Sequence, residues 1–314
     1  MIRSRLVRAA LIVGIAAQSI AARAAPIGLP PAETTWRSLE TANFRIVGDA
    51  PAKKMRLIGE SLERFRATLR LLKPQATASS PVPTLVLAFA TRRSFGPYGH
   101  VGLEPGREIS GIFQRTPWGN YIVFNASADE NDPLSVVFHE YTHFFVDTNY
   151  ATTPLWLNEG LAEFYSTFHA AASGLQVGRP VRYHVQMLRD GWKLPLARML
   201  AVGHDDPEYR EGDKVGPFYA QSWLLAHYVQ VGDRSLSPRL VDLLARLDRG
   251  EPLERAFPAA FAAGFEEMER RLIDYARQPT FQYVSYQVTD LRVPEVGQPE
   301  EIPRAAALAL LGEY

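Results

Sequence analysis

The segment HEYTH at residues 139–143 constrains this chain more than any other part of its sequence. An Asp-Pro pair at residues 132–133 is a good N-cap and first-turn pair, so the sequence predicts a helix that starts there and carries the segment in its interior. Residues four apart share one face of a helix. His139 and His143 can therefore place two imidazoles on one tetrahedral metal, with Glu140 at the rim of the same site.

A second helix is predicted to open after Pro154, where the sequence reads LWLNEGLAEFY. The intervening chain is long enough to turn and bring this helix back alongside the first, so Glu159 can supply a third ligand. Glu163, one turn later on the same face, is placed to accept a hydrogen bond from the far nitrogen of a liganding histidine. The chain has no Cys, so any metal must sit on His and carboxylates. The alternative is a buried polar cluster without metal.

The two segments HEYTH and PLWLNEGLAEFY resemble the gluzincin superfamily of zinc metallopeptidases, and are most similar to the peptidase MA-like domains of exported bacterial proteins. The resemblance covers residues 36–278. It implies Zn²⁺ as the cofactor, with the following roles: His139, His143 and Glu159 as metal ligands, Glu140 as general base, and Glu163 as hydrogen-bond acceptor of a ligand. It also implies a Tyr or His that donates to the oxyanion. Tyr219 is the candidate for this role, and His184, Tyr165 and His227 compete with it.

The activity implied by the resemblance is that of a zinc-dependent metallopeptidase acting on a peptide or protein substrate. Glu140 would take a proton from a zinc-bound water and return it to the leaving amine. The sequence has no segment of the Gly-Ala-Met-Glu-Asn type ahead of the first motif helix, so recognition of a free amino terminus is not indicated. Two alternatives remain open. One is a catalytically idle or latent zinc-binding scaffold with a protein partner at its C-terminal helices, and the other is a hydrolase of a non-peptide or cell-wall amide.

Hydrophobic periodicity predicts an α+β fold with a small mixed sheet in its N-terminal subdomain and helices in its C-terminal one. The N-terminal α/β subdomain spans 25–130, the helical catalytic subdomain spans 131–280, and the zinc site lies between them. A C-terminal strand and helix at 281–314 form a tail that could begin a helical repeat. The predicted strands are 36–47, 81–90, 111–113, 120–124 and 281–288. The predicted helices are 53–72, 133–148, 155–168, 181–190, 216–231, 236–248, 265–277 and 304–314.

The strand at 120–124 has two interpretations, a core strand or a sheet edge that binds an extended peptide by strand addition. The sequence before residue 25 predicts a secretion signal, because three arginines precede an apolar stretch at 9–22 and Ala22-Arg23-Ala24 is a suitable cleavage site. That stretch is shorter than the roughly 20 residues of a membrane-spanning helix. We therefore expect an exported, periplasmic protein, cleaved after Ala24 and without a stable membrane anchor.

The charge composition argues against a nucleic-acid partner. Lys plus Arg and Asp plus Glu each number 34, so the chain has no net positive field to hold a phosphate backbone.

Overall fold

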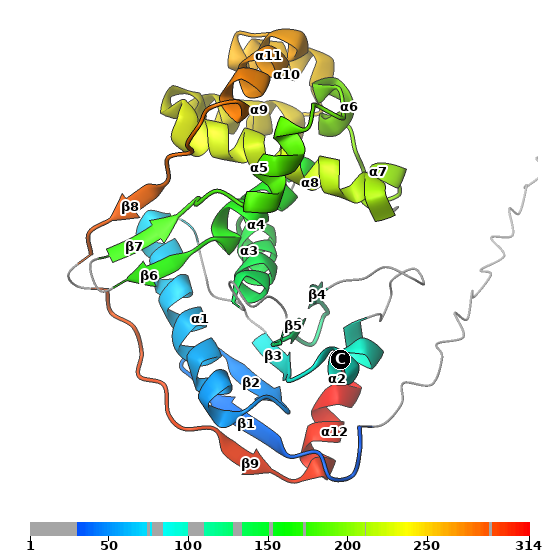
Figure 1. The fold of residues 1–314 in the computed structure, drawn as a ribbon, viewed down its shortest axis with the longest axis vertical. Coiled ribbons are helices and arrows are strands. Elements are labelled where there is room, and N and C mark those ends of the chain that lie inside the picture. Colours follow the sequence, from blue (N-terminus) through cyan, green and yellow to red (C-terminus); the bar gives the residue numbers. More distant parts are fainter. Residues whose placement is uncertain are drawn as a thin grey trace, which may run out of the picture.

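The computed structural model describes residues 30–73, 76, 84–99, 110–127, 134–150, 153–171, 174–210, 212–288 and 291–314. A six-stranded mixed sheet, a small three-stranded sheet and many helices give an α+β fold, as the sequence predicts (Figure 1). The predicted secretion signal at 1–24 and the Asp-Pro pair at 132–133 lie outside the described residues. Within the described ranges, no helix combines the length and the apolar character needed to cross a membrane.

The large sheet has the strand order β4-β5-β3-β2-β1-β9. Strands β2, β3 and β5 run parallel to one another, whereas β1, β9 and β4 are antiparallel to their neighbours. The bounds are β1 Trp36–Glu40, β2 Arg45–Gly48, β3 Thr84–Phe89, β4 Gly111–Arg115, β5 Asn120–Asn125 and β9 Glu300–Ile302. Strand β5 lies inside the sheet, so its interpretation as a core strand is confirmed. Among the described residues, β4 and β9 form the two edges of this sheet.

The single strand predicted at 36–47 is wrong, because a turn divides it into β1 and β2. The backbone N–H of Thr41 donates to the carbonyl of Phe44 at 2.9 Å, and the Thr41 side chain makes hydrogen bonds to Phe44 as well. A buried carboxylate, Glu63, accepts from the Thr41 hydroxyl at 2.7 Å and from the backbone N–H of Asn43 at 2.8 Å. These polar contacts hold the turn against the first helix, and periodicity does not reveal them.

Alternating side chains give the sheet two apolar faces, each covered by helices. On β3, Val86 and Ala88 join the core under helices α1 (Ala52–Leu72) and α3 (Ser135–Asn149), while Leu85 and Leu87 join a second core. The second core contains side chains from α2 (Arg92–Gly99) and from α12 (Arg304–Glu313). Both faces of the sheet are therefore buried, which explains why β3 reads as a continuous apolar run.

The C-terminal segment returns to the sheet instead of extending the helical part. In Figure 1 the chain runs from the helices past β8 (Val284–Tyr286) to β9 and α12, and ends beside α2. Strand β9 pairs with β1, and the hydroxyl of Tyr314 donates to the carbonyl of Tyr98 at 3.2 Å. The apolar side of α12 is buried against the sheet by Ala307, Leu310 and Leu311.

Truncation of Leu311 is expected to destabilise the protein, because its side chain is 7% exposed and fills the second core. Leu311→Ala should lower the free energy of unfolding by about 2–5 kcal/mol. Leu57→Ala on α1, where the side chain is 43% exposed, is the matched control and should change it by about 0.5 kcal/mol or less. Urea unfolding of both variants measures the difference. Equal, small losses would mean that α12 does not stabilise the sheet.

The helical part is built around α4 (Leu155–Ser166), which packs against both α3 and α8 (Gly212–His227). Helices α4 and α8 approach so closely at Gly160 that a Cβ there would collide with the carbonyl oxygen of Ser222. The helix predicted at 216–231 is α8 followed by the π-helix η1 (Tyr228–Gly232). Other bounds are α5 Arg182–Arg189, α6 Leu196–Leu200, α7 Pro207–Arg210, η2 Arg234–Leu236, α9 Ser237–Asp248, α10 Leu253–Phe261 and α11 Phe265–Ala276. Strands β6 His169–Ala171, β7 Gly174–Val177 and β8 form the small sheet.

Candidate metal centre

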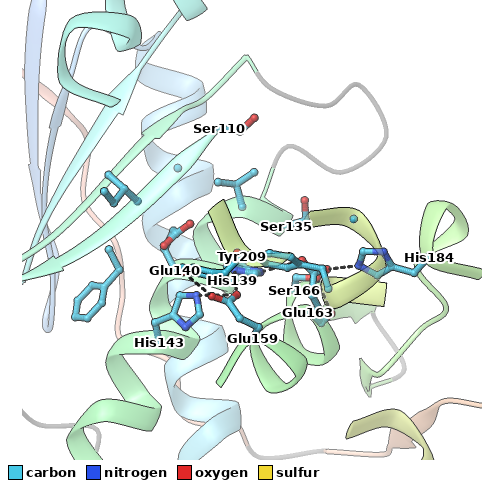
Figure 2. A pocket seen from close by; sticks show the side chains of 16 residues that line it. Ser110, Ser135, His139, Glu140, His143, Glu159, Glu163, Ser166, His184 and Tyr209 are labelled. Atoms are coloured by element: carbon cyan, nitrogen blue, oxygen red, sulfur yellow. Dashed lines mark hydrogen bonds and ion pairs between the residues drawn. The ribbon is translucent and has the colours of Figure 1, made fainter. Parts of the chain in front are cut away.

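The two motif segments lie on packed helices that face each other. His139 and His143 are one turn apart on α3, as predicted, with ring centroids separated by 4.7 Å. Glu159 projects toward both rings from α4. Figure 2 shows the two imidazoles and this carboxylate pointing toward one another, with Glu140 beside them. The structure thus brings together the three side chains predicted as metal ligands.

The spacing of these atoms fits one metal ion. Oε2 of Glu159 lies 3.5 Å from Nε2 of His139 and 3.6 Å from Nε2 of His143. Ligand atoms about 2.0–2.1 Å from a tetrahedral zinc lie roughly 3.3 Å from one another, so the cluster needs only a small contraction. Oε2 is buried and has no hydrogen-bond partner in the described part of the chain. In the metal-free protein this buried oxygen faces only the two imidazoles, at 3.5 and 3.6 Å, and a bound cation would satisfy it more fully.

Nδ1 of each ring faces a hydrogen-bond acceptor. Nε2 of each ring is therefore the nitrogen that can bind a metal. Nδ1 of His143 lies 2.9 Å from Oδ1 of Asn158, and the amide nitrogen of Asn158 points to a carboxylate oxygen of Asp147 at 3.4 Å. An amide oxygen only accepts, so the proton of His143 sits on Nδ1 and its Nε2 carries a lone pair. Nδ1 of His139 faces Oε1 of Glu163 at 3.5 Å. Glu163 thus lies where the sequence places it, next to the ring of a predicted ligand.

Glu140 is buried at the edge of the cluster, beside strand β4. The backbone N–H of Phe113 faces its carboxylate and acts to lower its pKa. Gly111 allows this close approach, because a Cβ there would collide with Val136 and lie 3.2 Å from the Glu140 carboxylate. Burial raises the pKa of Glu140, although the neighbouring imidazoles oppose the shift. A carboxylate with a raised pKa holds a proton more readily at neutral pH than an exposed one.

The cluster opens into a cleft of about 590 Å³ between β4 and the helices. Tyr219 of α8 lines this cleft, as does Tyr209 of α7. The two rings stack with an interplanar angle of 11° and a centroid distance of 6.2 Å. The hydroxyl of Tyr209 donates to Oε1 of Glu159 at 3.1 Å, so this tyrosine holds the carboxylate with its other oxygen toward the imidazoles.

The three other candidates for the oxyanion donor lie in three different places. His184 lines the cleft and donates from Nε2 to Oε2 of Glu163 at 3.0 Å. Tyr165 lines a separate cavity. His227 is buried between the hydroxyl of Tyr275, 2.8 Å from Nδ1, and the carbonyl of Gly178, 2.9 Å from Nε2, and burial lowers its pKa to about 4. Its contacts mark it as a packed core histidine.

Strong electrostatic coupling links the cluster in the metal-free protein. The pKa of His139 is raised to about 9. Burial acts to lower this pKa, but the carboxylates of Glu159, Glu163 and Glu140 raise it by more. Burial likewise acts to raise the pKa of Glu159, yet the two imidazoles hold it down at about 2. The pKa of Glu163 is also lowered, against burial, chiefly by His184. Without a metal, a proton on His139 compensates the buried carboxylates.

Metal binding is therefore expected to release a proton. Since the pKa of His139 is about 9 in the metal-free protein, the ring is protonated at pH 7.5 and must lose that proton to bind. Uptake of one Zn²⁺ at pH 7.5 should release at least one proton. The affinity should fall about tenfold for each pH unit below 9 and level off above it. Calorimetric titration in buffers of different ionisation enthalpy measures the release, and an enthalpy independent of buffer would contradict it.

Three contributors to the site were not assigned from the sequence. Asn158 stands next to Glu159 in the second motif, so its position was a signal that could have been used. Tyr209 lies 50 residues after Glu159 on the short helix α7, and nothing in its neighbourhood indicates a link. The N–H of Phe113 is a backbone group, for which side-chain patterns carry no information.

A family model described as "Protein of unknown function (DUF1570)" matches residues 134–254, which include both motif helices and α8. No curated protein matches the chain.

Proposed function

We propose that this chain is an exported zinc-dependent peptidase of the gluzincin type, with its metal between the sheet and the helices. The observation that carries the proposal is the convergence of His139, His143 and Glu159 within 4.8 Å, with the buried carboxylate of Glu140 beside them in an open cleft. A metal site that is only structural has no use for this additional carboxylate. Closed structural sites moreover use four protein ligands, whereas three leave one position open.

The donor set suits zinc. Two neutral imidazoles and one carboxylate are typical ligands of catalytic zinc. Asn158 supplies a supporting hydrogen bond at Nδ1 of His143, and the Glu163 carboxylate faces Nδ1 of His139 at 3.5 Å. When bound, zinc supplies a Lewis acid that lowers the pKa of a coordinated water to about 7 and polarises a carbonyl. Glu140 acts as the general base that takes the water proton, and delivers it to the leaving amine. The Phe113 N–H orients its carboxylate for this transfer.

Tyr219 is the better candidate for the group that donates to the oxyanion. A tyrosine hydroxyl is a donor at any pH below its pKa. The competing ring, His184, uses its Nε2 proton to bond Glu163, so the neutral ring presents only an acceptor at Nδ1. His184 instead fixes the carboxylate that faces Nδ1 of His139.

The edge strand supports a peptide as the substrate. Strand β4 lines the cleft at Gly111, Ile112 and Phe113, and its outer side has no neighbouring strand among the described residues. An extended peptide can add to such an edge by backbone hydrogen bonds, and it would then lie in the cleft that the cluster also lines. The edge strand beside the cleft is therefore β4. The strand considered for this role from the sequence is its neighbour at 120–124.

The assignment of Tyr219 predicts a selective kinetic defect. Tyr219→Phe should lower kcat by about 10²–10³ and leave zinc affinity unchanged, as expected for the loss of one oxyanion donor. Tyr209→Phe is the matched control from the same stacked pair. It removes the hydrogen bond to Glu159 and should weaken zinc binding by about 10–100-fold. Steady-state kinetics at saturating zinc, together with zinc titrations, separate the two effects. A reversed pattern would assign the oxyanion role to Tyr209.

The proposed function is tested by incubating the zinc-loaded protein with a mixed peptide library. A chelator-treated sample, the same sample after zinc is restored, and Glu140→Gln protein are the controls. We expect cleavage in the untreated and restored wild-type samples alone. Cleavage that survives chelation would contradict a zinc mechanism. No cleavage in any sample would reject the peptidase and favour the scaffold or the amide hydrolase considered from the sequence.

A further inference from the structure

A second cavity lies away from the metal centre and shares no lining residue with the cleft. It has a volume of about 280 Å³. Its wall is formed by the C-terminal end of α1, the last turn of α4, strands β7 and β8 of the small sheet, and the turn from η1 to α9. This volume is just below the usual range of about 300–1,000 Å³ for ligand pockets, so it suits only a small molecule.

The charged groups of this cavity all have one sign. Lys73 and Arg234 line it, and none of the described lining residues is acidic. In the described part of the chain Lys73 makes no side-chain hydrogen bond or ion pair, and burial lowers its pKa. Arg234 makes one long hydrogen bond, 3.4 Å from Nε to the carbonyl of Gln230, and no ion pair there. Arg234 is exposed and Lys73 is half-buried, so the cavity presents two positive charges and no described negative charge to a ligand, which favours an anion.

A third polar group in the cavity lacks a partner. Tyr165 is only 6% exposed, and its hydroxyl makes no hydrogen bond to any described residue. The hydroxyl is not one of the fully buried side-chain atoms without a partner, so it opens to the cavity and can donate to a ligand. Burial raises the pKa of Tyr165, which keeps the hydroxyl protonated.

The remaining wall is mixed, because the polar residues Gln230 and Ser237 line it beside apolar and aromatic side chains, and the apolar part limits the ligand class further. Phe164, Val177 and Val284 line it together with the ring of Tyr286. A compact inorganic ion would use the charged side of the cavity and leave this surface uncovered. We propose that the cavity binds a small organic anion, a carboxylate on an apolar body, with Lys73 and Arg234 supplying the positive charge and Tyr165 a hydroxyl hydrogen bond.

The test uses benzoate as the probe, by calorimetric titration of the full chain at constant ionic strength. A chelator keeps the protein free of zinc, so that the carboxylate cannot bind at the metal centre. Benzamide, which has the same shape and no charge, should bind at least tenfold more weakly than benzoate, since hydrogen bonds to a charged group are the stronger ones. Inorganic phosphate should also bind more weakly than benzoate, because it has no apolar part.

Variants locate the binding. Lys73→Met and Arg234→Met keep long apolar stems and should each weaken benzoate at least tenfold, and Tyr165→Phe should weaken it by a smaller factor. Lys53→Met, at the other end of α1, is the control and should leave the affinity unchanged. Thermal unfolding of each variant confirms that it folds. Equal binding of benzoate and benzamide, benzoate binding that survives both Met variants, tighter binding of phosphate, or no benzoate binding would each overturn the proposal. The result does not depend on peptidase activity.

Discussion

Glu140→Gln protein is expected to keep its zinc and to lose peptide hydrolysis by about 10²–10⁴ in kcat, a barrier increase of roughly 3–5 kcal/mol. Glutamine has the size of glutamate, and its amide oxygen can still accept from the Phe113 N–H. What it lacks is the ability to take a proton. The three ligands are untouched, so zinc should bind with at least its wild-type affinity.

Two measurements on the same protein decide this result. Zinc content after dialysis should be one per chain in both wild type and Glu140→Gln, and the rate should fall only in the variant. Glu266→Gln, on an exposed face of α11, is the control for the same chemical change. Undiminished hydrolysis by Glu140→Gln would remove the general-base role, and loss of zinc would mean that Glu140 is itself a ligand.

His143→Ala is expected to have the second large effect, this time on the metal. Removing one of three ligands also leaves the buried Glu159 carboxylate with one imidazole fewer. Zinc affinity should fall by more than the 10–100-fold that loss of a supporting hydrogen bond costs, and activity should be lost with it.

Two further variants form a graded series of zinc affinities with His143→Ala. Asn158→Ala removes only the acceptor at Nδ1 of His143 and should cost zinc affinity about 10–100-fold. His169→Ala removes an exposed histidine of β6 and should cost nothing. Competition titrations with a zinc-binding dye measure all three variants. Equal affinities across the series would show that zinc binds elsewhere.

Much of the site could be predicted because helical spacing is a local property. Four residues of separation place His139 and His143 on one face whatever the rest of the chain does, and the same holds for Glu159 and Glu163. The helices themselves also follow from periodicity, because α3 and α4 bury most of their circumference.

The parts that could not be predicted depend on distant segments meeting. Strand β9 has three residues, two of them glutamates, and pairs with β1 across almost the whole chain. A strand that short carries no alternation to detect. The return of α12 to the sheet, like the contact of Tyr209 with Glu159, depends on tertiary packing alone.

The measurement that tests the central claim most directly is the rate of peptide cleavage by metal-free protein as zinc is added back in known amounts. If His139, His143 and Glu159 hold the catalytic metal, the rate should rise linearly and level off at one zinc per chain. The Glu140→Gln protein should bind the same single equivalent and stay inactive. Full activity before any zinc is added, or a bound equivalent that never produces cleavage in the wild type, would contradict the account.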